Sequence, residues 1–312
     1  MEKSILFILS IPLSLFLWFG EHNNTPGNKS FSMTDTIPPK KDSTYTLTCN
    51  YCHGDLAEKK LKHTTNTNKG CEDCHATSGI PMDHKKGTIV LQKPLPDLCL
   101  SCHDKTKSLI SSSRVVHQVV NDKKSCVNCH SPHSSDEKSL LVTNRKDLCL
   151  SCHNKTITTK TKTLANIGQL DKNSKVVHPP FKKCSSSCHN PHASSNDKLL
   201  NTFFTSETYI AVNPDSFALC WECHDPELIT NPKTTTATNF RNGDKNLHYV
   251  HVHGEKGRSC MLCHNPHASN NPYLVREKVG FGNNWSFRMN YSSNENGGSC
   301  APGCHVERKY TR

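Results

Sequence analysis

The sequence predicts a fold of loops and short α-helices, with little or no β-sheet, organised around bound groups and not around a large apolar core. Three observations predict it. Only 34% of the 312 residues are hydrophobic and 7% are aromatic, which is little material for a packed interior. The chain has 18 cysteines and 20 histidines. The segments between cysteines are rich in Ser, Thr, Asn and Lys, whose ordering a purely protein interior would not offset.

The first element is an export segment at residues 1–20. An uncharged run of 15 residues from Ile5 to Phe19 follows a single lysine, which is typical of a signal peptide. As a helix this run is about 22 Å long, short for a hydrocarbon layer of about 30 Å. Bulky Trp18 and Phe19 stand where a cleavage site needs small residues, so an uncleaved N-terminal anchor is the alternative. Both alternatives place the remaining chain in the periplasm or another extracytoplasmic compartment.

The cysteines form nine motifs, seven of the type CxxCH and two of the type CxxxCH, and none is left over. A histidine follows the second cysteine every time. The motif cysteines are Cys49 and Cys52, Cys71 and Cys74, Cys99 and Cys102, Cys126 and Cys129, Cys149 and Cys152, Cys184 and Cys188, Cys220 and Cys223, Cys260 and Cys263, and Cys300 and Cys304. The motif histidines are His53, His75, His103, His130, His153, His189, His224, His264 and His305.

CxxCH is the attachment motif of c-type haem. Cysteines three apart on a helical turn present both sulfurs on one face, where each can bond to a porphyrin vinyl group, and the following histidine becomes the proximal iron ligand. In CxxxCH the cysteines are four apart, so we expect them to keep one helical face as well. Tetrahedral zinc and disulfides are the alternatives for paired cysteines, but neither explains a histidine after every pair.

Eleven histidines lie outside the motifs, and ten of them are candidates for the second axial position of nine irons. One precedes every second motif and another follows it, in three cases as CHxPH. His22 lies in the linker of residues 21–44 and is interpreted as a bystander. His248, His251 and His253 compete for two irons, and Met82 is an alternative to His84. The ten candidates are His63, His84, His117, His133, His178, His192, His248, His251, His253 and His267.

The motifs repeat in pairs, which predicts four dihaem units. The first two steps between unit starts, Cys49 to Cys99 and Cys99 to Cys149, are each 50 residues. Repetition at such a period is typical of stacked modules that bury surface against their neighbours. The predicted units are residues 45–98, 99–148, 149–219 and 220–299, with an unpaired ninth motif at residues 300–312.

With nine motifs and the CHxPH signature, residues 45–312 resemble the periplasmic multihaem cytochromes c with doubled CxxCH motifs. The resemblance implies loops and short helices wrapped around a haem chain, thioether bonds from all 18 cysteines, and nine covalently attached haems c with two histidines on each iron. It is also similar to decahaem conduits that sit inside an outer-membrane porin. Two CxxxCH motifs, an odd haem number and a first unit without Pro-His depart from the family pattern.

An iron with two imidazole ligands has no vacant position, so the predicted activity is electron conduction and not catalysis. Histidine ligands also predict low potentials and donors and acceptors of anaerobic or extracellular respiration. The implied partners are redox proteins; a membrane oxidoreductase, an outer-membrane porin and a polymer of the chain stay open. The alternative is a nitrite, hydroxylamine or tetrathionate reductase with one open iron, but those enzymes often carry CxxCK, and no such motif occurs in this sequence.

The net charge of +11 invites a nucleic-acid or anionic-membrane interpretation. Each ferric haem with ionised propionates adds about one negative charge, so nine haems reduce the total to roughly +2. We therefore expect the lysines to balance propionates and expect no nucleic-acid partner.

Overall fold

The computed structural model describes residues 49–64, 70–77, 84–85, 88–159, 163–182, 184, 187–205, 207–281 and 285–312. The predicted export segment 1–20, the linker 21–44, His22 and Met82 lie outside these residues. The chain divides into two units, Met1–Thr46 and Leu47–Arg312, and every described residue belongs to the second. No helix within the described ranges is long and apolar enough to cross a membrane.

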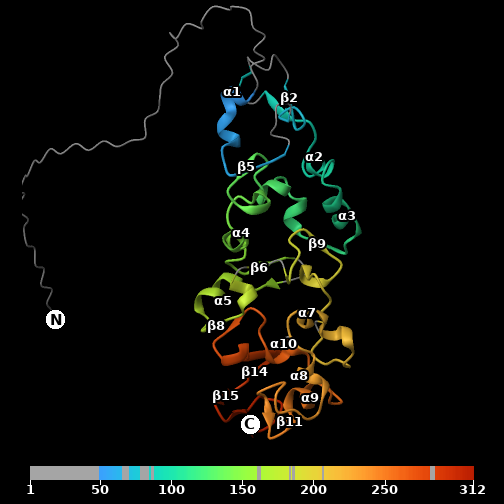
Figure 1. The fold of residues 1–312 in the computed structure, drawn as a ribbon, viewed down its shortest axis with the longest axis vertical. Coiled ribbons are helices and arrows are strands. Elements are labelled where there is room, and N and C mark those ends of the chain that lie inside the picture. Colours follow the sequence, from blue (N-terminus) through green and yellow to red (C-terminus); the bar gives the residue numbers. More distant parts are fainter. Residues whose placement is uncertain are drawn as a thin grey trace, which may run out of the picture. The chain divides into compact units, whose positions relative to one another are not determined.

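The helices are short, as predicted, and α1 to α5 follow one another along the second unit in chain order (Figure 1). Several begin at an Asn or Ser cap, such as Asn144, Asn166, Asn246 and Ser259, whose side chain accepts a hydrogen bond from a backbone N–H of the first turn. The α-helices are α1 (Asn50–His53), α2 (Asp97–Leu100), α3 (Asp104–Ser112), α4 (Arg145–Cys152), α5 (Ile167–Asn173), α6 (Pro179–Lys182), α7 (Ala218–Trp221), α8 (Glu227–Thr230), α9 (Leu247–Val252) and α10 (Cys260–Cys263).

Single turns of 3-10 helix connect these elements, as expected for short connectors. They are η1 (Gly54–Ala57), η2 (Gln118–Asn121), η3 (Ser125–Asn128), η4 (Lys138–Leu140), η5 (Asp197–Leu199), η6 (Pro214–Phe217) and η7 (Pro272–Leu274).

The strands are mostly two residues long and form isolated antiparallel pairs. A wider sheet, of order β15-β16-β17, occurs near the C-terminus. The prediction of little β-sheet is compatible with these short pairs, although strands are more numerous than expected. The strands are β1 (Leu61–Lys62), β2 (His75–Thr77), β3 (Ile89–Leu91), β4 (Val115–Val116), β5 (Ser134–Ser135), β6 (Ile157–Thr158), β7 (Thr163–Leu164), β8 (Val176–Val177), β9 (Ala193–Ser194), β10 (Arg241–Asn242), β11 (Lys245–Asn246), β12 (Ala268–Ser269), β13 (Lys278–Phe281), β14 (Trp285–Arg288), β15 (Tyr291–Asn294), β16 (Gly297–Cys300) and β17 (Arg308–Thr311).

Three of these pairs join segments that are far apart in sequence, and we call them the inter-unit ladders. They are β1 with β5, β4 with β9, and β8 with β12. In each ladder the strand before one motif pairs with the strand after the second motif of the next repeat. The ladder ends in a hydrogen bond between two histidine backbones, from His63 N to His133 O, His117 N to His192 O, and His178 N to His267 O, each 2.9 Å long.

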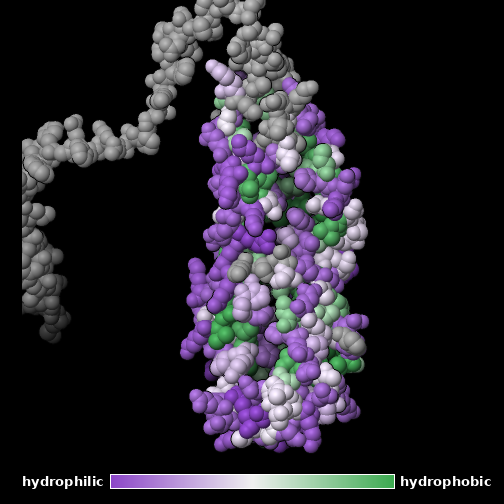
Figure 2. Space-filling model, in the orientation of Figure 1, coloured by the Kyte–Doolittle hydropathy of each residue, from purple (hydrophilic) through white to green (hydrophobic). Residues whose placement is uncertain are grey.

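Among the described residues, both clusters of buried apolar side chains lie within residues 200–312. One cluster contains Leu200, Phe204, Phe217, Ile229 and Val252. A second contains Val275, Val279, Phe287 and Met289. Among the described residues before position 193, Val120 and Phe181 are the buried hydrophobic side chains. Figure 2 shows that the visible face is largely hydrophilic, with separate hydrophobic patches, which agrees with the small apolar fraction of the sequence.

Candidate functional site

The seven CxxCH motifs share one local conformation. In each, the backbone N–H of the motif histidine donates to the carbonyl of the first cysteine, four residues earlier, which closes one turn of α-helix. This turn presents the two thiols and the imidazole together, as the spacing predicts. The hydrogen-bonded pairs are His53 with Cys49, His75 with Cys71, His103 with Cys99, His130 with Cys126, His153 with Cys149, His224 with Cys220 and His264 with Cys260, at 2.9 to 3.1 Å.

The CxxxCH motif at Cys300 does not adopt this helical turn, contrary to the sequence expectation. Cys300 ends strand β16, and the His305 backbone N–H donates to the Pro302 carbonyl. A Cβ at Gly303 would lie 2.9 Å from the Phe287 side chain, so the tight loop accepts only glycine there. The extra residue of this motif is absorbed by an irregular loop and not by a wider helical turn. In the other CxxxCH motif, Cys184 has a positive φ of 42°.

Each of the nine motif histidines faces one histidine from outside the motifs. The ring centroids of these pairs lie 5.8 to 6.5 Å apart. The pairs are His53 with His84, His75 with His133, His103 with His63, His130 with His192, His153 with His117, His189 with His267, His224 with His178, His264 with His248, and His305 with His251.

These distances fit two imidazoles on opposite sides of one metal ion. A metal–nitrogen bond of about 2 Å, with about 1.1 Å more to the ring centre, places two such centres about 6.3 Å apart. Direct ring stacking would bring them closer, as between Tyr249 and His253 at 4.2 Å. The facing rings therefore have the separation that a haem iron with two axial histidines requires.

Six of the nine pairs are built by the inter-unit ladders. Each ladder carries two non-motif histidines side by side, and they face motif histidines of different repeats. In the first ladder His133 faces His75 of the earlier repeat, whereas His63 faces His103 of the later repeat. The other two ladders repeat this crossed arrangement. The pairs therefore cross the predicted unit boundaries, and neighbouring units interlock.

The remaining three pairs are formed locally. His84 faces His53 within the first predicted unit. Helix α9 carries both His248 and His251, three residues apart on one face, and directs them to His264 and His305.

His253 is the third candidate of this region and faces no motif histidine. Its Nε2 lies 2.8 Å from the Ile229 carbonyl, and its ring stacks on Tyr249. Nε2 is the ring nitrogen farther from Cβ, and it is the atom with which a histidine of the facing pairs would bind a metal. In His253 this atom is already hydrogen-bonded to Ile229. Among the three candidates, the structure thus separates His253 from His248 and His251.

Several of the paired imidazoles are oriented by hydrogen bonds from Nδ1 to carbonyl oxygens, which leave Nε2 for a metal. Acceptors include Pro191 for His117 at 2.9 Å and Leu247 for His251 at 2.7 Å. Burial lowers the pKa of His248 and His267 to about 4. Both rings are therefore neutral at pH 7, which is the protonation state that binds a metal.

The thiols of consecutive motifs lie close to one another. Burial, followed by the neighbouring Cys126 thiol, raises the pKa of Cys99 to about 12. The same proximity is found for the pairs Cys49 and Cys71, Cys74 and Cys102, Cys129 and Cys149, Cys149 and Cys184, Cys220 and Cys260, and Cys263 and Cys300. The sixth and seventh motifs are connected by their facing residues His267 and His178, which share the third ladder. The nine motifs therefore follow one another in space in sequence order.

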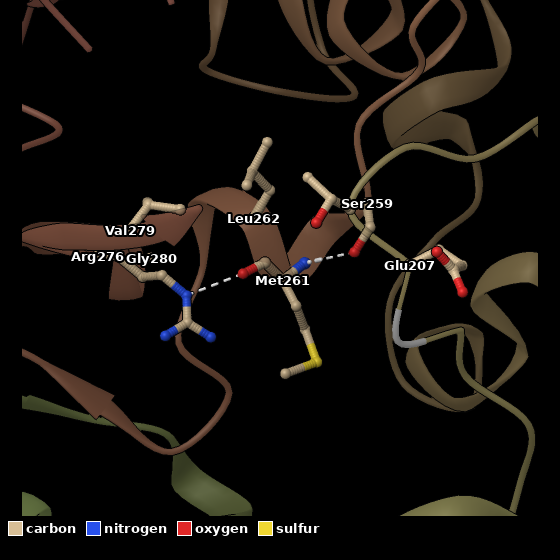
Figure 3. Close-up of a pocket in the computed structure, with 8 residues that line it drawn as sticks. Glu207, Ser259, Met261, Leu262, Arg276, Val279 and Gly280 are labelled. Carbon is tan, nitrogen blue, oxygen red and sulfur yellow. Dashed lines mark hydrogen bonds between the residues drawn. The ribbon is translucent and has the colours of Figure 1, made fainter. Parts of the chain in front are cut away.

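The eighth motif is braced by Arg276. Figure 3 shows Arg276 beside Met261 of helix α10, at a pocket of about 270 Å³. Arg276 Nε donates to the Met261 carbonyl at 2.8 Å and to the His264 carbonyl at 3.1 Å. The Ser259 hydroxyl accepts from Met261 N at 3.2 Å. These bonds hold the attachment loop and the start of its helix in one conformation.

Disulfides and tetrahedral zinc sites are the two alternatives for paired cysteines. All eighteen cysteines are thiols without a disulfide partner. Within the described ranges, no three or more His, Cys, Asp or Glu side chains gather closely enough to share one metal ion. The arrangement that recurs is instead two thiols, an adjacent imidazole and a second imidazole facing it, which are the four protein groups of a c-type haem with two histidine ligands.

Comparison with known proteins gives the same classification. The family described as "Doubled CXXCH motif" matches residues 63–108, 117–158, 178–228 and 251–281, more than half of the chain. A curated relative, "Multiheme cytochrome MtrA" of Shewanella baltica (strain OS185), is 26% identical over 244 residues, which cover 75% of this chain. The matched part spans 61% of the length of that relative. The chain belongs to the doubled-CXXCH family of multihaem cytochromes c.

Proposed function

We propose that this cytochrome holds nine haems c, each with two histidine ligands, and conducts electrons between redox proteins outside the cytoplasm. The observation that carries the proposal is the set of nine facing histidine pairs, one for each CxxCH or CxxxCH motif. The motif histidines would be the proximal ligands and their facing partners the distal ligands. His253 is then the one histidine of the ten candidates without an iron.

The haem supplies the reversible one-electron chemistry, and the protein determines where it occurs. The eighteen cysteines would hold the haems covalently, so attachment would need no deep pocket. The two facing imidazoles of each pair would orient the haem and would keep small molecules from its iron. This supports conduction over catalysis. No facing pair is incomplete among the nine motifs, so the geometry gives no support to an open, substrate-binding iron.

The spatial order of the motifs supports a continuous path. The thiols of Cys126, Cys149 and Cys300 are close enough to raise the pKa of Cys99, Cys129 and Cys263 of the neighbouring motif, so haems bonded to these cysteines would be near neighbours. An electron could then pass from the first to the ninth haem without leaving the chain. Histidine as both axial ligands favours low potentials, which suits partners in anaerobic or extracellular respiration.

The proposed location is the periplasm or another extracytoplasmic compartment, reached through the export segment at residues 1–20. Redox proteins are the proposed partners, with association to an outer-membrane porin or a membrane oxidoreductase as narrower forms of the same proposal. Haem propionates offset most of the positive charge, so the proposal includes no nucleic-acid partner.

The haem number is tested by intact mass spectrometry together with a pyridine haemochrome assay on protein exported with haem attachment. We expect nine haems per chain, and the mass also reveals whether residues 1–20 are removed. Electron paramagnetic resonance of the oxidised protein should contain low-spin ferric signals alone. A high-spin haem that binds nitrite or carbon monoxide in the unaltered protein would instead support the reductase.

The ligand assignment is tested by a matched pair of substitutions at the end of α9. His251→Ala should convert one of nine haems to a high-spin form that binds carbon monoxide, because His305 keeps its iron but loses the facing imidazole. His253→Ala should leave all haems low-spin, because its Nε2 is bonded to Ile229. The reverse result would assign the distal position to His253.

A further inference from the structure

Three two-residue segments adopt a strained backbone at equivalent positions in the repeats. Ser139 and Leu140 have φ of 58° and 54°, Lys198 and Leu199 have 57° for both, and Tyr273 and Leu274 have 55° and 59°. Positive φ is uncommon for residues other than glycine, and two such residues in succession are more unusual still. Each segment begins nine residues after a motif histidine. A costly conformation that recurs three times at one position needs a physical reason.

The strained segments direct a carbonyl at the Nδ1 atom of a motif histidine. His130 Nδ1 lies 2.8 Å from the Ser139 oxygen, His189 Nδ1 lies 2.8 Å from the Lys198 oxygen, and His264 Nδ1 lies 2.9 Å from the Tyr273 oxygen. Since a carbonyl only accepts, each Nδ1 carries the proton and donates it. The left-handed turn therefore fixes both the tautomer and the ring orientation.

Further hydrogen bonds, which recur in all three repeats, close the turn beside the imidazole. After the strained residues the chain returns to pair with the motif histidine backbone, at Leu141, Leu200 and Val275. The carbonyls of these three residues accept from the buried hydroxyls of Ser135, Ser194 and Ser269. The same serines belong to the inter-unit ladders, so the chain directly after each strained segment is tied to a ladder.

The second motif of the first repeat lacks this device. Its histidine, His75, has a buried Nδ1 for which the described residues provide no hydrogen-bond partner. The sequence after it, CHATSGIPMDH, has no CHxPH segment, and His75 belongs to strand β2, which pairs with β3. The second motifs of the four repeats therefore fall into two classes. In three of them, Nδ1 of the motif histidine donates a hydrogen bond to a backbone carbonyl. In the fourth, no such bond is found among the described residues.

We propose that the strained segments 139–140, 198–199 and 273–274 are positioning elements that strengthen the proximal imidazoles of His130, His189 and His264 as iron ligands, and that the haem at His75 has the most positive potential of these four. A hydrogen bond from Nδ1 makes the imidazole a stronger electron donor and stabilises ferric iron, which lowers the potential. This inference rests on the proposed function, in which the motif histidines ligate haem iron.

The test must isolate one haem among nine. Replacing its distal histidine by methionine does so, because a methionine ligand raises the potential of that haem above the bis-histidine haems. In a His192→Met background, the haem at His130 is read separately in a redox titration. Ser139→Pro is compared there with Ser139→Gly. Proline cannot adopt positive φ, whereas glycine adopts it without strain.

We expect Ser139→Pro to shift the separated midpoint to a more positive value and Ser139→Gly to leave it unchanged. Equal midpoints in these two variants, at full haem content, would overturn the inference. A haemochrome assay on each variant keeps the two proposals apart: fewer than nine haems in the unaltered protein contradicts the proposed function, whereas nine haems with equal midpoints contradicts the positioning role alone.

A second comparison needs no change in the strained turns, and it decides the matter if Ser139→Pro fails to fold. Methionine is introduced singly at His133, His192, His267 and His248, which isolates the haems at His75, His130, His189 and His264 in turn. We expect the His133→Met protein to have the most positive separated midpoint of the four. A midpoint at or below those of the other three variants would overturn the inference.

Discussion

Residues 49–199 and residues 200–312 carry the same attachment motifs but bury different groups. In the first region, Val120 and Phe181 are the buried side chains larger than alanine among the described hydrophobic residues. In the second, two clusters of aromatic and aliphatic residues are buried. The first region is held by inter-unit ladders, whereas the second has protein cores and the three-stranded sheet β15-β16-β17.

The comparison of the two regions shows how a histidine outside the motifs can be positioned by a few backbone hydrogen bonds, without a packed core. In the ladder region, two backbone strands of two residues each place two histidines for two neighbouring repeats. After the ladder of β8 with β12, the facing residues His248 and His251 come from helix α9 instead. Val252 of that helix belongs to the first apolar cluster. A helix at this position therefore depends on side-chain packing, and a ladder depends on backbone hydrogen bonds and on the haems beside it.

The largest effect should come from removing the haems. Protein produced without haem attachment is expected to lose the fold of residues 49–199, where the porphyrins supply the missing apolar interior, and to keep residual structure in residues 200–312. Limited proteolysis followed by mass spectrometry measures this. Cleavage should be about tenfold or more faster in the first region, since it follows the population of open states. Equal rates in both regions would contradict the comparison, and the haem-loaded protein is the control.

A smaller effect is expected from truncating the core. Phe217 is fully buried in the first cluster, and Phe217→Ala should cost about 3–5 kcal/mol of unfolding free energy. Val120→Ala, the matched change in the ladder region, should cost only about 1–2 kcal/mol because fewer buried carbons are removed. Denaturant unfolding followed by circular dichroism compares the two. An equal or larger loss for Val120→Ala would mean that the ladder region also relies on side-chain packing.

The smallest effect is expected from a surface ion pair across the second ladder. Arg114 and Asp197 are 3.1 Å apart, but their side chains are 62% and 50% exposed. Exposed pairs contribute about 0–1 kcal/mol, so Asp197→Asn should change the unfolding free energy by less than about 1 kcal/mol. The measurement is the same denaturant titration, at low and high salt. A larger, salt-sensitive loss would show that charge, in addition to the backbone ladder, joins these repeats.

Much of the candidate site could be predicted from local sequence. The spacing of Cys49, Cys52 and His53 is enough to expect a helical turn with both thiols on one face, and the structure has that turn in all seven CxxCH motifs. The same reasoning was wrong for the CxxxCH motif at Cys300, because helical spacing alone does not include the crowding of Phe287 against Gly303. Local rules hold where a single turn decides the geometry, and they fail where a distant side chain intervenes.

Which histidines face each other could not be read from the sequence. His130 faces His192 and not the nearer His133, because the ladder between β4 and β9 brings a later repeat alongside. His253 follows His251 by two residues in the segment YVHVH, yet its ring stacks on Tyr249 and is hydrogen-bonded to Ile229. The positions of candidate ligands in the sequence do not show in which direction each side chain points, because the packing around helix α9 decides that direction.

By itself, the sequence determined the nine motifs of two cysteines and a histidine, the family and the short repeating elements, because each of these depends on residues within a few positions of one another. The tertiary structure alone decided which motif histidine faces which histidine from outside the motifs, the interlocking of repeats and the lack of an acceptor for His75 Nδ1 among the described residues. The physical reason is that these features depend on backbone ladders between residues far apart in the chain, whose partners are chosen by the folded packing of all repeats together.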